Sequence, residues 1–197
     1  MFDSSVSVVV AYHSGYGHTT RMATAARDGA AMVTGANAEM IMIETLDDSH
    51  WEQLDAADAI IFASPTYMGS ASPAFHRFAH DSSSRWQTQK WKDKLAAGVT
   101  TSGSMSGDKL HTLQYFTLLA AQHGMHWVNL DLLPGSTDAD LNRLGGWLGA
   151  MGRCPGDQGP EAMLESDLRT AAHLGQRVAT HAQLLSHARA ASPAVMA

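Results

Sequence analysis

The chain has 197 residues, of which 45% are hydrophobic and 16% are charged, a composition typical of globular rather than disordered proteins. The formal net charge is −6 and no cluster of lysine or arginine stands out, so we expect no nucleic-acid partner. The one cysteine, Cys154, excludes an internal disulfide framework. Because no secretory leader and no apolar run of membrane-spanning length is found, the sequence predicts a cytoplasmic protein without a membrane span.

Strand-like and helix-like segments alternate along the chain, which is typical of an open parallel sheet with helices on both faces. Short apolar runs predict strands at 6–12, 38–43, 59–63, 95–100 and 127–130. Helices are expected at 19–33, 51–57, 73–80, 110–122 and 161–185, the third of them beginning at Pro73, a residue tolerated in a first turn. We therefore predict a flavodoxin-like, doubly wound α/β fold: a five-stranded parallel sheet in the order 2-1-3-4-5.

Two further segments fall outside these elements. Residues 133–160 are rich in glycine and proline and are expected to form a long loop, whose Trp147 and Leu148 look exposed and suited to covering the site of a neighbouring subunit. Residues 1–190 are expected to form one domain, with the Ala-rich chain fraying after Ser186 and residues 191–197 forming a disordered tail.

The most informative feature of the sequence is the turn that follows the first predicted strand. It reads Ser14-Gly15-Tyr16-Gly17-His18-Thr19-Thr20 and leads directly into a helix. Free backbone N–H groups, hydroxyl donors and the helix dipole at such a turn favour a phosphate. Because this first loop (residues 14–20) contains no lysine, it suits a monophosphate better than a triphosphate, and we predict bound flavin mononucleotide (FMN).

Two more loops are expected at the same edge of the sheet. The second loop (residues 64–70) is Ser-Pro-Thr-Tyr-Met-Gly-Ser, and the third loop (residues 101–108) is Thr-Ser-Gly-Ser-Met-Ser-Gly-Asp. In doubly wound sheets, ligands lie outside the carboxyl ends of the strands. The two loops could therefore grip the flavin ring, and their N–H groups would stabilise negative charge on the reduced ring.

These three loops, with Gln122-His123-Gly124-Met125 further along, resemble the WrbA-type NAD(P)H:quinone oxidoreductases, a flavodoxin-like family of FMN enzymes. The likeness runs over residues 6–178 and includes a late Gly-Pro segment and the Glu-x-Asp-Leu start of the last helix. The family usually has Arg-Phe where this chain has Tyr67-Met68, and a run of glycines where it has Met105-Ser106.

The resemblance implies a set of ligand-binding residues, in which the first loop holds the phosphate and the other two loops line the ring. His123 would reach the flavin, in one arrangement from a neighbouring subunit, and Tyr16 and Trp86 would face the nicotinamide or the substrate. The implied FMN-binding residues are Ser14, Gly15, Tyr16, Gly17, His18, Thr19, Pro65, Thr66, Tyr67, Met68, Gly69, Thr101, Ser102, Gly103, Ser104, Met105, Ser106, Gly107 and His123.

The residues themselves leave other interpretations open. The first loop could be a shortened dinucleotide fingerprint with Glu44 on a ribose, although Thr20 stands where the third glycine belongs, or it could bind no ligand. Tyr67 and Met68 could be ordinary rim residues, Trp86 could belong to a core or an interface, and His123 could cap a helix end.

Two other chemistries are disfavoured. His76 and His80 lie four residues apart, but no third ligand accompanies them, so no metal site is predicted. Met105 stands where the nucleophile of a serine hydrolase would have to be.

The expected function is an FMN-dependent oxidoreductase that passes two electrons from NAD(P)H to a quinone by ping-pong exchange on the flavin face. The flavin carries the chemistry, so no catalytic side chain is predicted. The alternative is a flavodoxin-type single-electron carrier that does not oxidise NAD(P)H, and an FMN-holding protein without turnover is a third possibility. The resemblance implies a homodimer or homotetramer.

Overall fold

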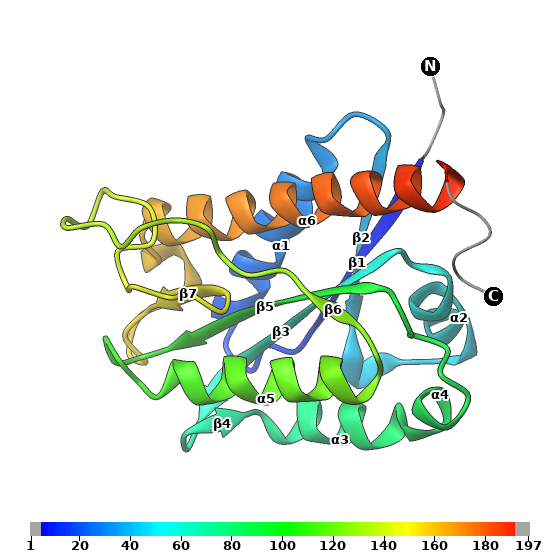
Figure 1. Cartoon of the computed structure of the whole chain (residues 1–197). Coiled ribbons are helices and arrows are strands. Elements are labelled where there is room, and N and C mark those ends of the chain that lie inside the picture. Colours follow the sequence, from blue (N-terminus) through cyan, green and yellow to red (C-terminus); the bar gives the residue numbers. More distant parts are fainter. Residues whose placement is uncertain (1–4, 192–197) are drawn as a thin grey trace.

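The computed structural model describes residues 5–191, which form a parallel sheet between two layers of helices (Figure 1). The main path through the sheet is β2-β1-β3-β5-β6, and every pair of neighbours along it is parallel. These strands are β1 (Val6–Tyr12), β2 (Ala36–Met42), β3 (Ala59–Tyr67), β5 (Leu95–Ser102) and β6 (His126–Trp127). The flavodoxin-like α/β arrangement expected from the sequence is therefore present.

The predicted number of five strands is wrong, because the sheet has seven in the described residues. The edge beside β5 is shared by two short strands: β6 pairs with Leu95 and Ala96, and β7 (Ala150–Arg153) pairs with residues 99–102. The predicted strand 127–130 is correspondingly reduced to two residues, and part of the expected long loop 133–160 is strand β7. A two-residue strand β4 (Ser70–Ala71) pairs antiparallel with the end of β3.

The helices cover the two faces of the sheet and enclose two apolar cores (Figure 1). Helices α1 (His18–Ala31) and α6 (Glu165–Ala191) pack on one face. Helices α2 (Asp48–Ala56), α3 (Pro73–Asp81) and α5 (Lys109–Gln122) pack on the other face. The remaining helices are short: η1 (Ile43–Thr45), α4 (Ser83–Gln87), which the sequence analysis missed, and η2 (Pro160–Ala162).

The local sequence explains why these elements form where they do. The central strands β1 and β3 are covered on both faces, so they are almost continuously apolar instead of alternating. The side chain of Asp47 caps α2, and Ser72 caps α3 in front of Pro73. Helices α1 and α6 cross closely because a Cβ at Gly29 or Gly175 would collide with a carbonyl of the facing helix.

Several predicted boundaries need correction. Strand β3 continues through Pro65 to Tyr67, because β1 ends opposite Ala63 and the missing proline N–H therefore costs no bond of the β1 ladder. Helix α6 begins at Glu165 and is regular to Ala191, so the expected fraying after Ser186 is wrong. The rest of the expected tail, residues 192–197, lies outside the described residues.

Two further expectations concern exposed surfaces. Trp147 is half exposed as expected, whereas Leu148 is partly buried against the second core. Over residues 5–191, we find no helix that combines the length and the apolar character needed to cross a bilayer.

Candidate functional site

The three loops predicted to bind FMN meet at one edge of the sheet, where the carboxyl ends of β1, β3 and β5 lie together (Figure 1). They enclose a cavity of about 290 Å³. A fourth segment, which follows β7, also lines the cavity; the sequence placed it only within the long loop 133–160, which was expected to cover the site of a neighbouring subunit. The lining residues are Ser14, Tyr16, His18, Thr19, Pro65, Thr66, Tyr67, Thr101, Ser102, Gly103, Cys154 and Gly156.

The first loop has the features of an anion-binding turn. Gly17 is the N-cap of α1 with φ +85°, and no side chain caps the helix and no acidic residue lies in its first turn. The positive end of the helix dipole is therefore left without a partner from the protein. The hydroxyl oxygen of Ser14, which lines the cavity, is buried without a hydrogen-bond partner. An orphaned donor beside an uncapped helix end fits a phosphate group.

Buried hydroxyl groups join the three loops below the cavity. Thr19 Oγ1 lies 2.8 Å from Thr101 Oγ1 and so connects the first loop to the third. Thr66 Oγ1 lies 2.8 Å from both Thr100 Oγ1 and Thr112 Oγ1 and so connects the second loop to β5 and α5. The relative position of the loops is thus fixed by the fold before any ligand binds. The Thr19 hydroxyl, predicted to serve the phosphate, already has a protein partner.

Two tyrosines form the apolar wall of the cavity. Tyr67, at the end of β3, meets Tyr16 edge-on, with ring centroids 6.4 Å apart. Burial raises the pKa of Tyr67, so its hydroxyl is neutral at physiological pH. A Cβ at Gly15 would lie 2.6 Å from the Tyr67 hydroxyl, so the close approach of the two loops requires glycine there. Tyr16 is 75% exposed and stands at the mouth of the cavity.

The tip of the second loop is a tight hairpin turn between β3 and β4. Met68 and Gly69 both have positive φ, +49° and +83°, and the Met68 side chain is fully exposed. The turn is held from the outside, because His111 Nδ1 lies 2.6 Å from the Gly69 carbonyl oxygen and His76 Nε2 lies 3.0 Å from Ser70 Oγ. These contacts fix the hairpin beside the cavity, although Met68 and Gly69 themselves do not line it.

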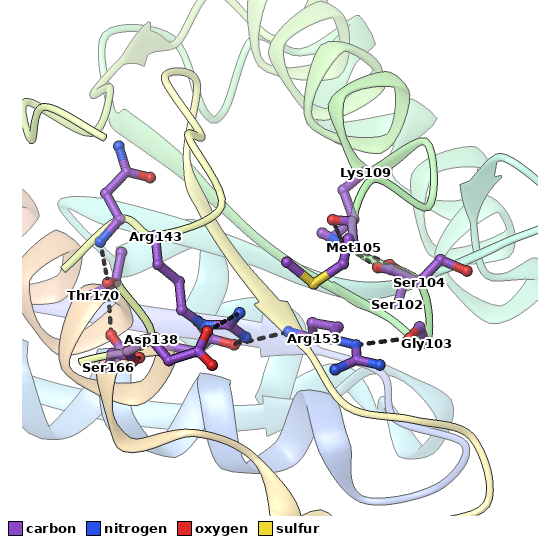
Figure 2. Close-up of polar contacts among 12 residues, drawn as sticks. Ser102, Gly103, Ser104, Met105, Lys109, Asp138, Arg143, Arg153, Ser166 and Thr170 are labelled. Atoms are coloured by element: carbon purple, nitrogen blue, oxygen red, sulfur yellow. Dashed lines mark hydrogen bonds and ion pairs between the residues drawn. The ribbon is translucent and has the colours of Figure 1, made fainter. Parts of the chain in front are cut away.

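The third loop is held from within the protein by two cations that the sequence analysis missed. The ammonium group of the fully buried Lys109 donates to Ser102 Oγ, Ser104 O and Met105 O at 2.7, 3.0 and 3.0 Å. Arg153 Nε donates to Gly103 O at 3.2 Å (Figure 2). Of the predicted loop residues, Thr101, Ser102 and Gly103 line the cavity, whereas Ser104, Met105, Ser106 and Gly107 form the rest of the turn.

The segment after β7 belongs to the same site. Cys154 N–H donates to Ser102 O at 3.2 Å, and burial raises the pKa of the Cys154 thiol, which disfavours a reactive thiolate. His18 Nε2 lies 2.9 Å from Gln158 O, and Arg21 donates to Pro160 O at 3.0 Å. This segment is therefore tied to the start of α1 of its own chain. Only the glycine- and proline-rich composition of the region pointed to it in the sequence.

Two predicted residues do not lie with the others. His123 is the C-cap of α5, whose N-terminus adjoins the third loop; a 14-residue helix places its two ends about 21 Å apart. His123 is buried, with Nε2 2.9 Å from Ser82 Oγ and its ring against Trp91, and burial lowers its pKa to about 4. Trp86 lies in α4 at that same distant edge (Figure 1). Within one chain, the structure brings neither residue to the cavity.

The chain is similar to proteins of one family. Residues 48–135 match the family model described as NADPH-dependent FMN reductase. A protein named "Flavodoxin FldP" from Pseudomonas aeruginosa is 40% identical over 184 residues, which cover 90% of this chain and 97% of that protein. A protein of Geotalea uraniireducens named NAD(P)H dehydrogenase (quinone) is 28% identical, over 92% of this chain and all of that one.

A solved structure shows the same similarity in three dimensions. The flavodoxin-type, WrbA-like protein from Agrobacterium tumefaciens superposes with a TM-score of 0.74 and is 42% identical; the match covers 91% of this chain and 99% of that one.

Proposed function

Because the chain belongs to the WrbA-type, flavodoxin-like FMN reductase family, we propose that it is a cytoplasmic FMN-dependent oxidoreductase that passes two electrons from NAD(P)H to a quinone. The observation that carries this proposal is the cavity at the carboxyl edge of the sheet, where an orphaned serine hydroxyl adjoins an uncapped helix N-terminus. Residues 1–190 act as a single FMN-binding domain in this proposal.

The first loop holds the phosphate of FMN. The buried Ser14 hydroxyl and the free N–H groups at the start of α1 would donate to the phosphate oxygens. The left-handed backbone at Gly17 turns the chain into the helix at this point. Tight binding follows from geometry that is already present, because the threonine pair Thr19–Thr101 fixes the loop against β5.

The second and third loops hold the flavin ring. Tyr67 offers an apolar edge, and Ser102 and Gly103 of the third loop also line the cavity. Small side chains in the third loop leave room for a second flat molecule, so nicotinamide and quinone would use the same face in turn, as ping-pong exchange requires. Tyr16, exposed at the mouth of the cavity, would lie beside the molecule that enters.

FMN, when bound, supplies the redox chemistry: it accepts a hydride from NAD(P)H and passes two electrons on to the quinone. The quinone also takes up two protons, one from the hydride donor and one from solvent. The residues of this chain bind and orient the partners, and none of them has to act as acid or base.

The test is an anaerobic reduction. The FMN-loaded protein is mixed with NADPH, and separately with NADH, and the flavin absorbance is followed before a quinone is added. We expect bleaching by one equivalent of at least one nicotinamide and full recovery on addition of one equivalent of quinone. Free FMN at the same concentration is the control. A flavin that stays oxidised with both nucleotides would refute the proposal.

An electron carrier is the second candidate, because the relative with 40% identity is named a flavodoxin. Such a carrier would be reduced only after a separate reductase is added. A redox titration would then show two well-separated one-electron steps, whereas the enzyme should show a single two-electron step. The two functions therefore give opposite outcomes with the same purified protein.

We also propose that the chain forms a homodimer or homotetramer. Two large apolar side chains of the segment between β6 and β7 are exposed, Leu133 to 79% and Trp147 to 53%, and they could be covered by another copy. Trp86 and His123 are too far from the cavity of their own chain, and Trp86 could meet a ligand only across such an interface. Sedimentation at working concentration tests this assembly, and a monomer would exclude it.

A further inference from the structure

Lys109 is unusual because a lysine ammonium group is almost never fully buried. Its side chain is 0% exposed, and its three hydrogen bonds all go to the third loop, namely Ser102 Oγ, Ser104 O and Met105 O. None of these acceptors is a carboxylate, so the charge is solvated by the dipoles of the loop itself. Figure 2 shows the lysine next to Ser102, Ser104 and Met105.

The surroundings of Lys109 carry an excess of positive charge. Arg153 from β7 donates to Gly103 O, and Arg143 from the segment before β7 lies nearby. One buried carboxylate, Asp167 of α6, accepts two bonds from Arg143 at 2.8 Å and the backbone N–H of Arg153 at 2.9 Å. Three cations thus face one buried anion, while the other acid of the cluster, Asp138, is 80% exposed.

Lys109 and Arg153 determine which way the peptide groups of the third loop point. The carbonyl oxygens of Gly103, Ser104 and Met105 are all turned toward Arg153 or Lys109. In a trans peptide the N–H points opposite to the C=O, so the N–H groups of the three following residues point away from the cations. Within residues 5–191, the N–H groups of Ser104, Met105 and Ser106 have no acceptor in the protein.

We propose that Lys109 is a positioning residue: its buried ammonium group, helped by Arg153, holds the third loop so that its unpaired N–H groups and the positive charge beneath them stabilise negative charge on bound FMN. This inference rests on the proposed function, because it assumes that FMN occupies the cavity. Reduction of the ring by two electrons and one proton adds one negative charge. Lys109 should therefore favour the reduced cofactor over the oxidised one.

A purely structural role for Lys109 would affect both redox states alike. The distinguishing quantity is the two-electron midpoint potential of bound FMN, measured by titration with dithionite and mediators at pH 7. For Lys109→Met we expect the affinity for reduced FMN to fall about tenfold more than that for oxidised FMN. That difference lowers the potential by about 30 mV.

The pH profile gives a second readout. Burial lowers the pKa of Lys109 to about 8; Asp167 opposes this effect, and Arg143 and Arg153 add to it. Above that pH the wild type should lose its ammonium charge, so the difference in potential between wild type and Lys109→Met should shrink between pH 7 and pH 9. Lys109→Arg keeps the charge at both pH values and should remove this pH dependence.

The matched control is Lys92→Met, which removes an exposed lysine charge at the opposite edge of the sheet and should leave the potential unchanged. Should Lys109→Met fail to fold, the potential of Arg153→Gln and the pH profile of the wild type test the same idea. An unchanged potential in variants that bind FMN would overturn the role of Lys109. If the wild type binds no FMN, the proposed function fails instead.

Discussion

The first and third loops lie at the same edge of the sheet but are built in different ways. The first loop owes its shape to its own residues: Gly17 turns the chain, and the start of α1 supplies the donors. The third loop is held by Lys109, which directly follows it, and also by distant residues: Arg153 of β7 lies 50 residues beyond Gly103, and Asp167 of α6 lies 14 residues beyond Arg153. The proposed phosphate site is thus built locally, whereas the proposed control of charge on the ring combines the neighbouring Lys109 with the distant Arg153.

The largest expected effect is on the support of the third loop. Asp167→Ala leaves the buried Arg143 guanidinium and the Arg153 N–H without their acceptor. Breaking a buried ion pair costs about 3–5 kcal/mol of unfolding free energy. Urea denaturation monitored by circular dichroism measures the loss. Asp138→Ala is the control, since this exposed partner of the same arginine should cost less than about 1 kcal/mol. Equal losses would show that Asp167 does not organise the cluster.

The buried ammonium of Lys109 predicts a pH dependence of stability without FMN. Its pKa is about 8 in the folded protein and about 10.5 in the unfolded chain, so the unfolded state binds more protons between these values. Stability should therefore rise with pH in this window, by at most about 3 kcal/mol for the full shift. Below pH 8 the whole cost of burying the charge is present.

A comparison of the wild type with Lys109→Met isolates the contribution of Lys109 to this pH dependence. Lys94 is partly buried, and burial lowers its pKa in the same direction, so the pH dependence of the wild type alone cannot report on Lys109. The difference in unfolding free energy between wild type and Lys109→Met, measured from pH 7 to pH 10, removes the shared terms. A difference in unfolding free energy that stays constant from pH 7 to pH 10 would contradict a lowered pKa of Lys109.

The first loop should respond to a change of backbone at Gly17. Valine is strained at φ +85° and would also approach Pro160, since a Cβ there lies 3.1 Å from its Cγ. We expect Gly17→Val to weaken FMN binding by about 2–3 kcal/mol, measured by fluorescence quenching of the flavin. Gly35→Val provides the control, because Gly35 has φ +83° but follows α1 at the opposite edge. It should lower stability without changing FMN affinity.

The same contrast explains what the sequence could predict. Strands β1, β3 and β5 and the first loop were found because their signals are local: apolar runs that end at small, polar turns. The cavity-lining Cys154 and Gly156 were missed because β7 returns to the sheet only through a contact far along the chain. Lys109 was missed because a lysine at a helix start is normally exposed, and nothing near it in the sequence indicates burial.

His123 and Trp86 stay predictions that a single chain does not fulfil by itself. Both were assigned to the ligand through the family resemblance, yet α5 carries His123 away from the third loop, and its Nε2 is occupied by Ser82. The sequence around His123 shows that a helix ends there, but not at which edge of the sheet that end lies. The carboxyl end of α5 lies at the amino edge of the sheet, which places His123 away from the cavity of its own chain (Figure 1).

The smallest effect expected separates the two hydroxyl groups of the first loop. The Ser14 oxygen has no partner in the protein, whereas Thr19 is bonded to Thr101. Ser14→Ala should therefore weaken FMN binding by about 1.5 kcal/mol, which is the lower end of the range for a hydrogen bond to a charged group. It should leave the unfolding free energy of the FMN-free protein unchanged. Thr19→Val should instead lower that stability, by about 1 kcal/mol, because it breaks a buried bond between loops. Calorimetric titration with FMN and urea denaturation distinguish the two. If Ser14→Ala bound FMN as tightly as the wild type, the phosphate would have to lie elsewhere in the cavity.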